Sequence, residues 1–159
     1  MARRITLYGI LTAVCMVLGY IESLLPLDFI APGIKIGLSN SVALLLVVKK
    51  DIKGAFSVNI ARILLSALLF SAPSVLIYSL SGGIISIVVM RLALKTEKLS
   101  TVGLSVSGAV SHNLTQLTVA VLMLGKGMWY YLPILLMSAV ISGIATGTVA
   151  EILFKKKII

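Results

Sequence analysis

Seven polar residues stand in or beside apolar stretches of the chain and are the candidates for binding chemistry. Arg62 lies near the middle of an apolar run, where a cation costs about 2.5 to 3.5 kcal/mol unless it meets a partner or water. We therefore expect Arg62 to face a ligand, or else to serve as a structural arginine that binds carbonyls or an acid. The residues that would cooperate with it around a small molecule are Lys35, Asn40, Asn59, His112, Asn113 and Gln116.

Spacing groups several of these side chains on common helix faces. Asn59 and Arg62 are three residues apart, and His112 and Gln116 are one turn apart, so each pair can face one cavity. His112 could contact a ligand, respond to protons or pack as a neutral histidine. Asn113 and Gln116 could instead form hydrogen bonds between helices. No second histidine, and no cysteine or acid at ligand spacing, accompanies His112, which argues against a metal site.

Residues 31–40 interrupt the apolar pattern and place a cation there. Pro32 and Gly33 delay the next helix to about Lys35, and its apolar run, 36–48, has only 13 residues before Lys49. Such a helix spans roughly 20 Å, less than the hydrocarbon core of a bilayer. We therefore expect its N-terminus to begin below the membrane surface, with Lys35 and unpaired backbone N–H groups forming an anion-accepting end.

The acidic residues do not support an enzyme. Prenyl diphosphate chemistry needs paired acids that hold Mg²⁺, and the five acids here are dispersed. A phosphate-cradling G-x-x-x-x-G-K-[ST] loop is also missing, so the chain is not expected to hydrolyse ATP by that route. We predict no catalytic residue and no cofactor. The five acids are Glu22, Asp28, Asp51, Glu97 and Glu151.

Composition identifies an integral membrane protein. The 159 residues are 59% hydrophobic and 12% charged, and the mean hydropathy is +1.13, far from the values of soluble domains. The net charge of +9 arises from short basic clusters at the ends of apolar runs, which favours a bilayer partner over nucleic acid. The one cysteine, Cys15, cannot form an intrachain disulfide and is expected to be a small buried hydrophobic residue.

The pattern predicts an all-α, polytopic membrane protein in which residues 1–159 form a single transmembrane domain. Apolar runs separated by polar turns indicate six transmembrane helices. A Pro-punctuated, Leu- and Phe-containing segment at 22–35 is expected to fold back as a lid. The predicted spans are 5–20, 36–48, 54–70, 74–94, 101–124 and 132–154.

The distribution of basic residues predicts the topology in the cell membrane. Six spans place both termini on one side, and nearly all Lys and Arg residues outside the spans fall on that side. The positive-inside rule therefore predicts that both termini are cytoplasmic. Only Lys35 and Lys126 fall on the opposite side. The basic residues on the terminal side are Arg3, Arg4, Lys49, Lys50, Lys53, Arg91, Lys95, Lys98, Lys155, Lys156 and Lys157.

Small residues at helical spacing predict close helix contacts. Gly9 and Ala13 stand four residues apart in the first span, which suits either packing within the protein or docking of a partner. Ala139, Gly143 and Gly147 form a second stripe in the last span, where we expect helix packing.

Several motifs together resemble those of the Gx transporter family, also labelled heptaprenyl diphosphate synthase component I. The resemblance extends over nearly the whole chain, and the PGIK and HNxxQ stretches are its most specific parts. That family is in turn similar to the S components of energy-coupling factor (ECF) transporters. The motifs are PGIKIGLSN at 32–40, RIL at 62–64, SLSGG at 79–83, GAVSHNLTQ at 108–116 and YLP at 131–133.

The resemblance implies an ECF S-component-like bundle of six helices, with cytoplasmic termini and an outward-facing pocket capped by the loop after the first helix. It also implies partners: a transmembrane T component and two ATPase subunits. S components often present an Ala-x-x-x-Ala pair on the first helix for docking. The equivalent here is Gly9-x-x-x-Ala13, which departs from that pattern.

These observations lead to one main hypothesis and two alternatives. The first is a substrate-binding subunit of an ECF-type ABC importer for a micronutrient or vitamin-like molecule, with an anionic or hydrogen-bond-accepting group. The second is a non-catalytic membrane accessory subunit of isoprenoid or quinone metabolism. The third is a stand-alone solute facilitator.

Overall fold

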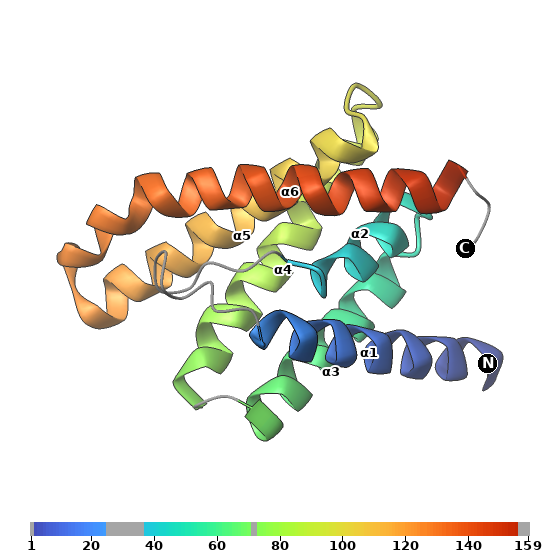
Figure 1. Ribbon diagram of the computed structural model, residues 1–159, viewed down its shortest axis with the longest axis horizontal. Helices are drawn as coiled ribbons and strands as arrows, with labels where there is room; N and C mark the ends of the chain where they lie inside the picture. The colour runs from blue at the N-terminus through green and yellow to red at the C-terminus, as the bar shows by residue number, and fades with distance from the viewer. Residues whose placement is uncertain (1, 25–36, 71–72, 156–159) are drawn as a thin grey trace.

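The computed structural model describes residues 2–24, 37–70 and 73–155, and these residues form helices without any strand. Six α-helices follow one another in the predicted order, so the all-α prediction is confirmed (Figure 1). A 3₁₀ helix, η2, stands between the last two. The helices are α1 (Ala2–Ser23), α2 (Asn40–Val48), α3 (Ile52–Phe70), α4 (Pro73–Lys95), α5 (Thr101–Leu124), η2 (Lys126–Tyr131) and α6 (Leu132–Lys155).

Four helical segments within the described residues are long and apolar enough to cross a membrane. They are α1, most of α3, most of α4, and the segment that runs from η2 through α6. With nine residues, α2 is too short, at roughly 14 Å, to cross the hydrocarbon core. Polar residues of α5 interrupt its apolar character. The chain is therefore a membrane-type helical protein.

The helix boundaries differ most from the predicted spans at α1 and α2. The first helix continues to Ser23 instead of ending at Tyr20. The short second helix begins at Asn40 instead of Ile36, because Gly37 adopts a left-handed backbone with φ of 79° that a regular helix cannot contain. Lys35 and the lid-like loop, apart from its first residues 22–24, lie outside the described residues.

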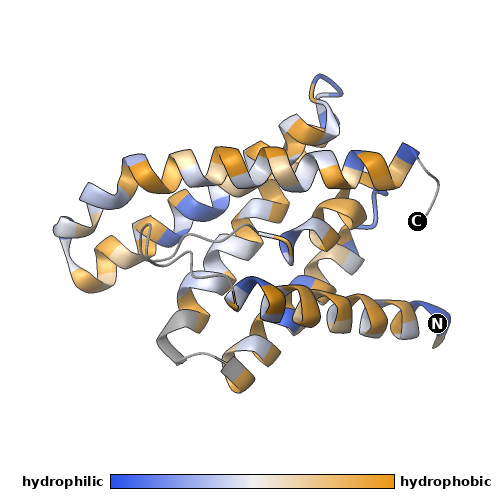
Figure 2. Ribbon diagram, viewed as in Figure 1, coloured by the Kyte–Doolittle hydropathy of each residue, from blue (hydrophilic) through white to orange (hydrophobic). Residues whose placement is uncertain are grey.

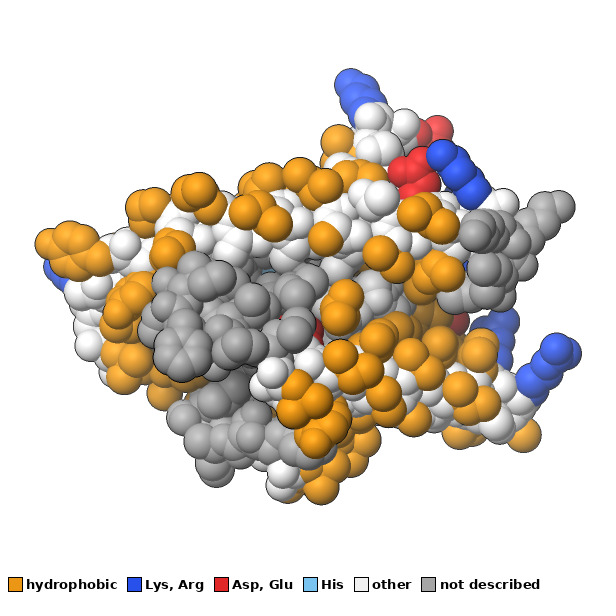
Figure 3. Space-filling view, in the orientation of Figure 1, with side chains coloured by type: hydrophobic (Ala, Val, Ile, Leu, Met, Phe, Trp, Pro, Cys, Tyr) orange, Lys and Arg blue, Asp and Glu red, His pale blue; other side chains and the backbone are white. Residues whose placement is uncertain are grey.

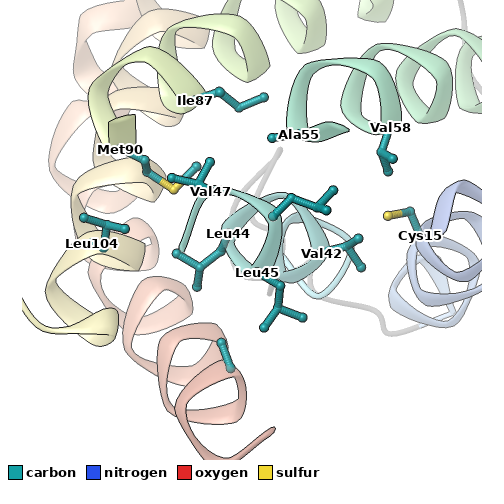
Figure 4. Packing of buried hydrophobic residues seen from close by; sticks show 12 residues of the cluster. Cys15, Val42, Leu44, Leu45, Val47, Ala55, Val58, Ile87, Met90 and Leu104 are labelled. Atoms are coloured by element: carbon teal, nitrogen blue, oxygen red, sulfur yellow. The ribbon is translucent and has the colours of Figure 1, made fainter. Parts of the chain in front are cut away.

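The short helix α2 is the centre of the hydrophobic core. All six residues from Val42 to Val47 are buried, and they pack against side chains of the surrounding helices, among them Cys15 of α1, Val58 of α3 and Ile87 of α4 (Figure 4). Cys15 is thus the buried apolar residue that the sequence predicted. A helix that is apolar on every side is buried as a whole. The polar N-terminal end of α2 therefore lies in the interior of the molecule.

The helices α5 and α6 approach each other closely along small residues. An added methyl group at Gly143 would lie 2.7 Å from Cα of Val106, and one at Gly147 would lie 2.7 Å from Cα of Val102. Ala139, also on α6, is fully buried. The predicted packing stripe of α6 is therefore confirmed.

The outer surface is largely apolar along the helices, with the charges at their ends. Figure 2 shows hydrophobic positions along the length of α1 and α6, and hydrophilic positions near helix ends and within part of α5. The start of α1 and the end of α6 lie at the same end of the bundle (Figure 1). Lys and Arg side chains gather at that end in Figure 3.

Candidate functional site

Arg62 of α3 joins its own helix to the start of α2 through three hydrogen bonds. Its Nη1 donates to Ser39 Oγ at 2.7 Å, and its Nη2 donates to Asn40 Oδ1 at 3.1 Å and to Asn59 Oδ1 at 2.9 Å. The sequence-predicted residues Asn40, Asn59 and Arg62 are therefore brought together. We call Ser39, Asn40, Asn59 and Arg62 the Arg62 group.

The acceptors around Arg62 are all neutral. A guanidinium has five N–H donors, and three of them are used by the Arg62 group. Among the described residues, Lys155 and Glu151 form an ion pair at 3.0 Å, and Arg62 does not take part in one. The cation is half-buried and is stabilised by hydroxyl and amide dipoles. Two of its N–H groups have no acceptor within the described part of the chain.

Glu22 contacts the segment that leads into the Arg62 group. Its side chain is only 6% exposed, and its Oε1 accepts a hydrogen bond from the backbone N–H of Gly37 at 2.5 Å. Residues 37–40 are thus held between an acid of α1 and an arginine of α3. Sequence reasoning assigned no role to Glu22 or to Ser39. Two features of the sequence could have indicated these roles: Glu22 stands at the end of an apolar helix, and Ser39 stands directly before Asn40.

Two backbone N–H groups at the start of α2, where the sequence predicted an anion-accepting end, are already hydrogen-bonded. The N–H of Asn40 donates to the carbonyl of Gly37 at 2.8 Å, and the N–H of Ser41 donates to that of Leu38 at 3.2 Å. The turn formed by the residues before α2 satisfies these donors. Positive charge at this place is therefore supplied by the Arg62 side chain.

Two adjacent glycines of α4 bring a second set of polar side chains near the first. A methyl group at Gly83 would overlap Asn59 Nδ2, while one at Gly82 would lie 2.9 Å from Gln116 Cγ and 3.1 Å from His112 Cε1. His112 and Gln116 are both half-buried. The sequence-predicted pairs of α3 and α5 thus lie on the two flanks of one short stretch of α4.

Asn113 has a different position from its two neighbours in the motif. Its Nδ2 donates to the backbone carbonyl of Leu135 on α6 at 3.0 Å. This is the interhelical hydrogen bond that the sequence left open as an alternative, and it ties α5 to α6.

Comparison with known proteins identifies the family. Residues 11–153 match the family described as heptaprenyl diphosphate synthase component I, which is nearly the whole chain. The chain belongs to this family. Neither the curated proteins nor the solved structures yielded a match. This description is the second label of the family that the sequence motifs predicted, so the family prediction is confirmed.

In this member of the heptaprenyl diphosphate synthase component I family, Gly9 and Ala13 line an open groove between α1 and α3. The groove has a volume of about 820 Å³ and is bordered mainly by apolar side chains. A methyl group added at Gly9 would meet nothing within 4 Å. Gly9 is thus not used for packing between the described helices. The residues that line the groove are Gly9, Thr12, Ala13, Met16, Val17, Tyr20, Ala61, Leu65 and Leu69.

Three acidic residues of this family member each contact different partners. Glu22 binds Gly37, Asp51 binds Tyr8 and Gly54, and Glu151 pairs with Lys155. Within residues 2–24, 37–70 and 73–155, no three His, Cys, Asp or Glu side chains come together in a way that could hold a metal ion.

Proposed function

We propose that this protein is the substrate-binding membrane subunit of an ECF-type ABC importer. Its substrate is a micronutrient or vitamin-like small molecule with an anionic or strongly hydrogen-bond-accepting group. The observation that carries the proposal is the Arg62 group, in which an interior cation of a membrane-type bundle is surrounded by neutral acceptors.

The energetics favour a ligand at Arg62. A charged residue at membrane depth is costly, and such residues mark substrate paths or pair with other groups. An arginine with a purely structural role is commonly paired with a carboxylate, because charge-assisted hydrogen bonds are stronger than hydrogen bonds between neutral groups. Here the fixed hydroxyl and amides hold the guanidinium in place, and the buried carboxyl group of Glu22 acts on it electrostatically without forming an ion pair with it. An anionic group of the substrate would complete the pair.

The groove between α1 and α3 supports the partner part of the proposal. The small residues Gly9 and Ala13 allow another helix to approach the backbone closely, as in membrane helix pairs. We assign this groove to the transmembrane T component. Two ATPase subunits would supply the energy, because this chain has no phosphate-binding loop of the usual type.

The gathering of Lys and Arg at the end where α1 begins and α6 ends supports a cytoplasmic position for that end (Figure 3). In this orientation, η2 faces outward with its aromatic residues Trp129, Tyr130 and Tyr131, which suit a membrane interface. We place the protein in the cell membrane with six crossings, of which the short helix α2 is one.

The proposal is tested by mass spectrometry of small molecules released from the purified protein. We expect wild-type protein to release one organic solute in near-stoichiometric amount and Arg62→Gln to release at least tenfold less, the effect of losing one charge-assisted contact. Arg91→Gln is the matched control because Arg91 is exposed on α4. Equal solute content in wild type and Arg62→Gln would contradict the proposal.

The family name favours a second candidate function. A protein described as component I of heptaprenyl diphosphate synthase could be a non-catalytic membrane subunit that holds a soluble prenyl synthase at the bilayer. Co-purification separates the two: ATPase-bearing partners support the importer, and a soluble prenyl synthase supports the accessory subunit. Uptake into liposomes that contain this protein alone would indicate a stand-alone facilitator.

A further inference from the structure

Gly83 of α4 controls the position of the Asn59 amide. Asn59 is 3% exposed, and its amide has α4 on one side and Arg62 on the other: Nδ2 lies against Gly83, while Oδ1 accepts from Arg62 Nη2. A side chain at position 83 would occupy the place of Nδ2. The buried amide could move away only by giving up its hydrogen bond to Arg62.

Gly82 has the same relation to α5. A methyl group there would lie 3.0 Å from the backbone oxygen of His112, in addition to its contacts with the side chains of His112 and Gln116. Contacts this short require α5 to move, since a backbone oxygen cannot rotate aside. The absence of a side chain at Gly82 therefore sets how closely α5 approaches α4.

Together the two glycines place the α3 and α5 groups beside each other. Adjacent residues of an α-helix point in directions about 100° apart, so Gly82 and Gly83 serve neighbouring flanks of α4. The α-carbons of Gly82 and Gly83 are about 3.8 Å apart. The Asn59 amide contacts the methyl position of Gly83, and the Gln116 side chain contacts that of Gly82. The two side chains therefore lie on the order of 10 Å apart or less. One small organic molecule could therefore reach both groups.

We propose that Gly82 and Gly83 are positioning residues that join the Arg62 group and the His112–Gln116 pair into one binding site. Gly83 keeps the Asn59 amide against Arg62, and Gly82 brings Gln116 within reach of the same solute. This inference rests on the proposed function and narrows its substrate class. The solute carries an acidic group for Arg62 and, within about 10 Å, a hydrogen-bonding group for α5.

The first test is a double-mutant cycle that needs no ligand. Melting temperatures of the detergent-purified protein are compared for wild type, Gly83→Ala, Asn59→Ala and the double variant. We expect Gly83→Ala to lower the melting temperature by several degrees in wild type. The decrease should be much smaller when Asn59→Ala has removed the amide that the methyl group displaces. Strictly additive effects would overturn the role of Gly83.

The second test reads the Arg62 environment directly. Phenylglyoxal modification of Arg62 is followed by peptide mass spectrometry, with the exposed Arg91 of the same molecule as internal reference. Gly83→Ala and Asn59→Ala are both expected to accelerate modification of Arg62 by roughly threefold to tenfold, the equivalent of one net hydrogen bond. A purely structural role of Gly83 would change the melting temperature and leave this ratio unaltered, which would overturn the proposal.

Gly103→Ala is the matched control. The added methyl group would lie at ordinary contact distances, with Leu99 Cδ2 nearest at 3.4 Å, so stability and Arg62 reactivity should equal those of wild type. Gln116→Ala is expected to reduce the solute released from purified protein at least threefold while Arg62 reactivity stays unchanged. If Gln116→Ala releases as much solute as wild type, α5 does not contribute to the binding site. A wild-type protein without any bound solute would count against the importer and leave the positioning of Asn59 intact.

Discussion

Two carboxylates fasten the ends of α1 to the rest of the bundle. Near its N-terminus, Tyr8 Oη donates to Asp51 Oδ2 at 2.7 Å, and near its C-terminus Glu22 accepts from Gly37. Asp51 also caps α3, because its Oδ1 accepts from the backbone N–H of Gly54 at 3.0 Å. Asp51 and Glu22 thus act as separate structural ties.

The Asp51 tie predicts a loss of stability in acid. The hydrogen bond from Tyr8 lowers the pKa of Asp51 below its ordinary value, with further lowering by the Gly54 N–H and the positive charge of Arg4. A carboxyl group whose pKa is lowered by folding stabilises the protein above its unfolded pKa of about 3.9 and loses that contribution as pH falls through the folded pKa. We expect the melting temperature of wild type to fall below about pH 4.

The matched variants isolate this carboxyl group. Tyr8→Phe should flatten the acid-dependent decrease, since its Asp51 would titrate nearer the unfolded value. Asp51→Ala should cost about 1 kcal/mol at neutral pH through the lost helix cap. If Tyr8→Phe and wild type show the same dependence between pH 6 and pH 3, the proposed cause of the shift is wrong.

Single residues of the Arg62 group were only partly predictable from the sequence. Arg62, Asn40 and Asn59 are polar residues in or beside apolar runs. The free-energy cost of placing polar groups in a membrane was enough to identify them as candidates. Glu22 was expected in the loop after the first helix, whereas α1 continues to Ser23 and holds Glu22 in the interior against Gly37.

At the scale of elements, α2 decides where the site lies. Its six consecutive buried residues show no polar face, so hydrophobic periodicity could predict its existence and shortness but not its neighbours. Its start was predicted four residues too early, since the left-handed backbone of Gly37 is a tertiary feature supported by Glu22. Polar residues 39 and 40 reach the interior because α2 begins there.

Packing of α2 predicts an unequal effect of two leucine truncations. Leu44 is 2% exposed within the core, whereas Leu68 of α3 is 81% exposed. Leu44→Ala should destabilise the protein by about 2 kcal/mol, at the low end for such changes, because lipid is as apolar as the core and mainly lost packing remains. Leu68→Ala should change stability by less than about 0.5 kcal/mol. Unfolding in mixtures with denaturing detergent measures both, and equal effects would contradict the central place of α2.

At the scale of the whole molecule, the proposed binding site and the proposed docking groove are separate. The Arg62 group lies where α2 and α3 meet α4, whereas the groove that Gly9 and Ala13 line opens between α1 and α3. One helix, α3, contributes to both, with Asn59 and Arg62 on one face and Ala61, Leu65 and Leu69 on another. A change in the groove can therefore be made without touching the polar residues around Arg62.

This separation predicts that Ala13→Leu weakens partner assembly while solute binding persists. A larger side chain in the groove would hold a partner helix away from the backbone, since membrane helices associate through small residues and close van der Waals contact. We expect recovery of the T component and ATPases with affinity-tagged protein to fall at least tenfold, and the released solute to remain at the wild-type amount. Ala145→Leu, on an exposed face of α6, is the control and should retain the partners. Equal recovery with both variants would place the docking surface elsewhere, while parallel loss of solute and partners in Ala13→Leu would show that the two surfaces are coupled through α3.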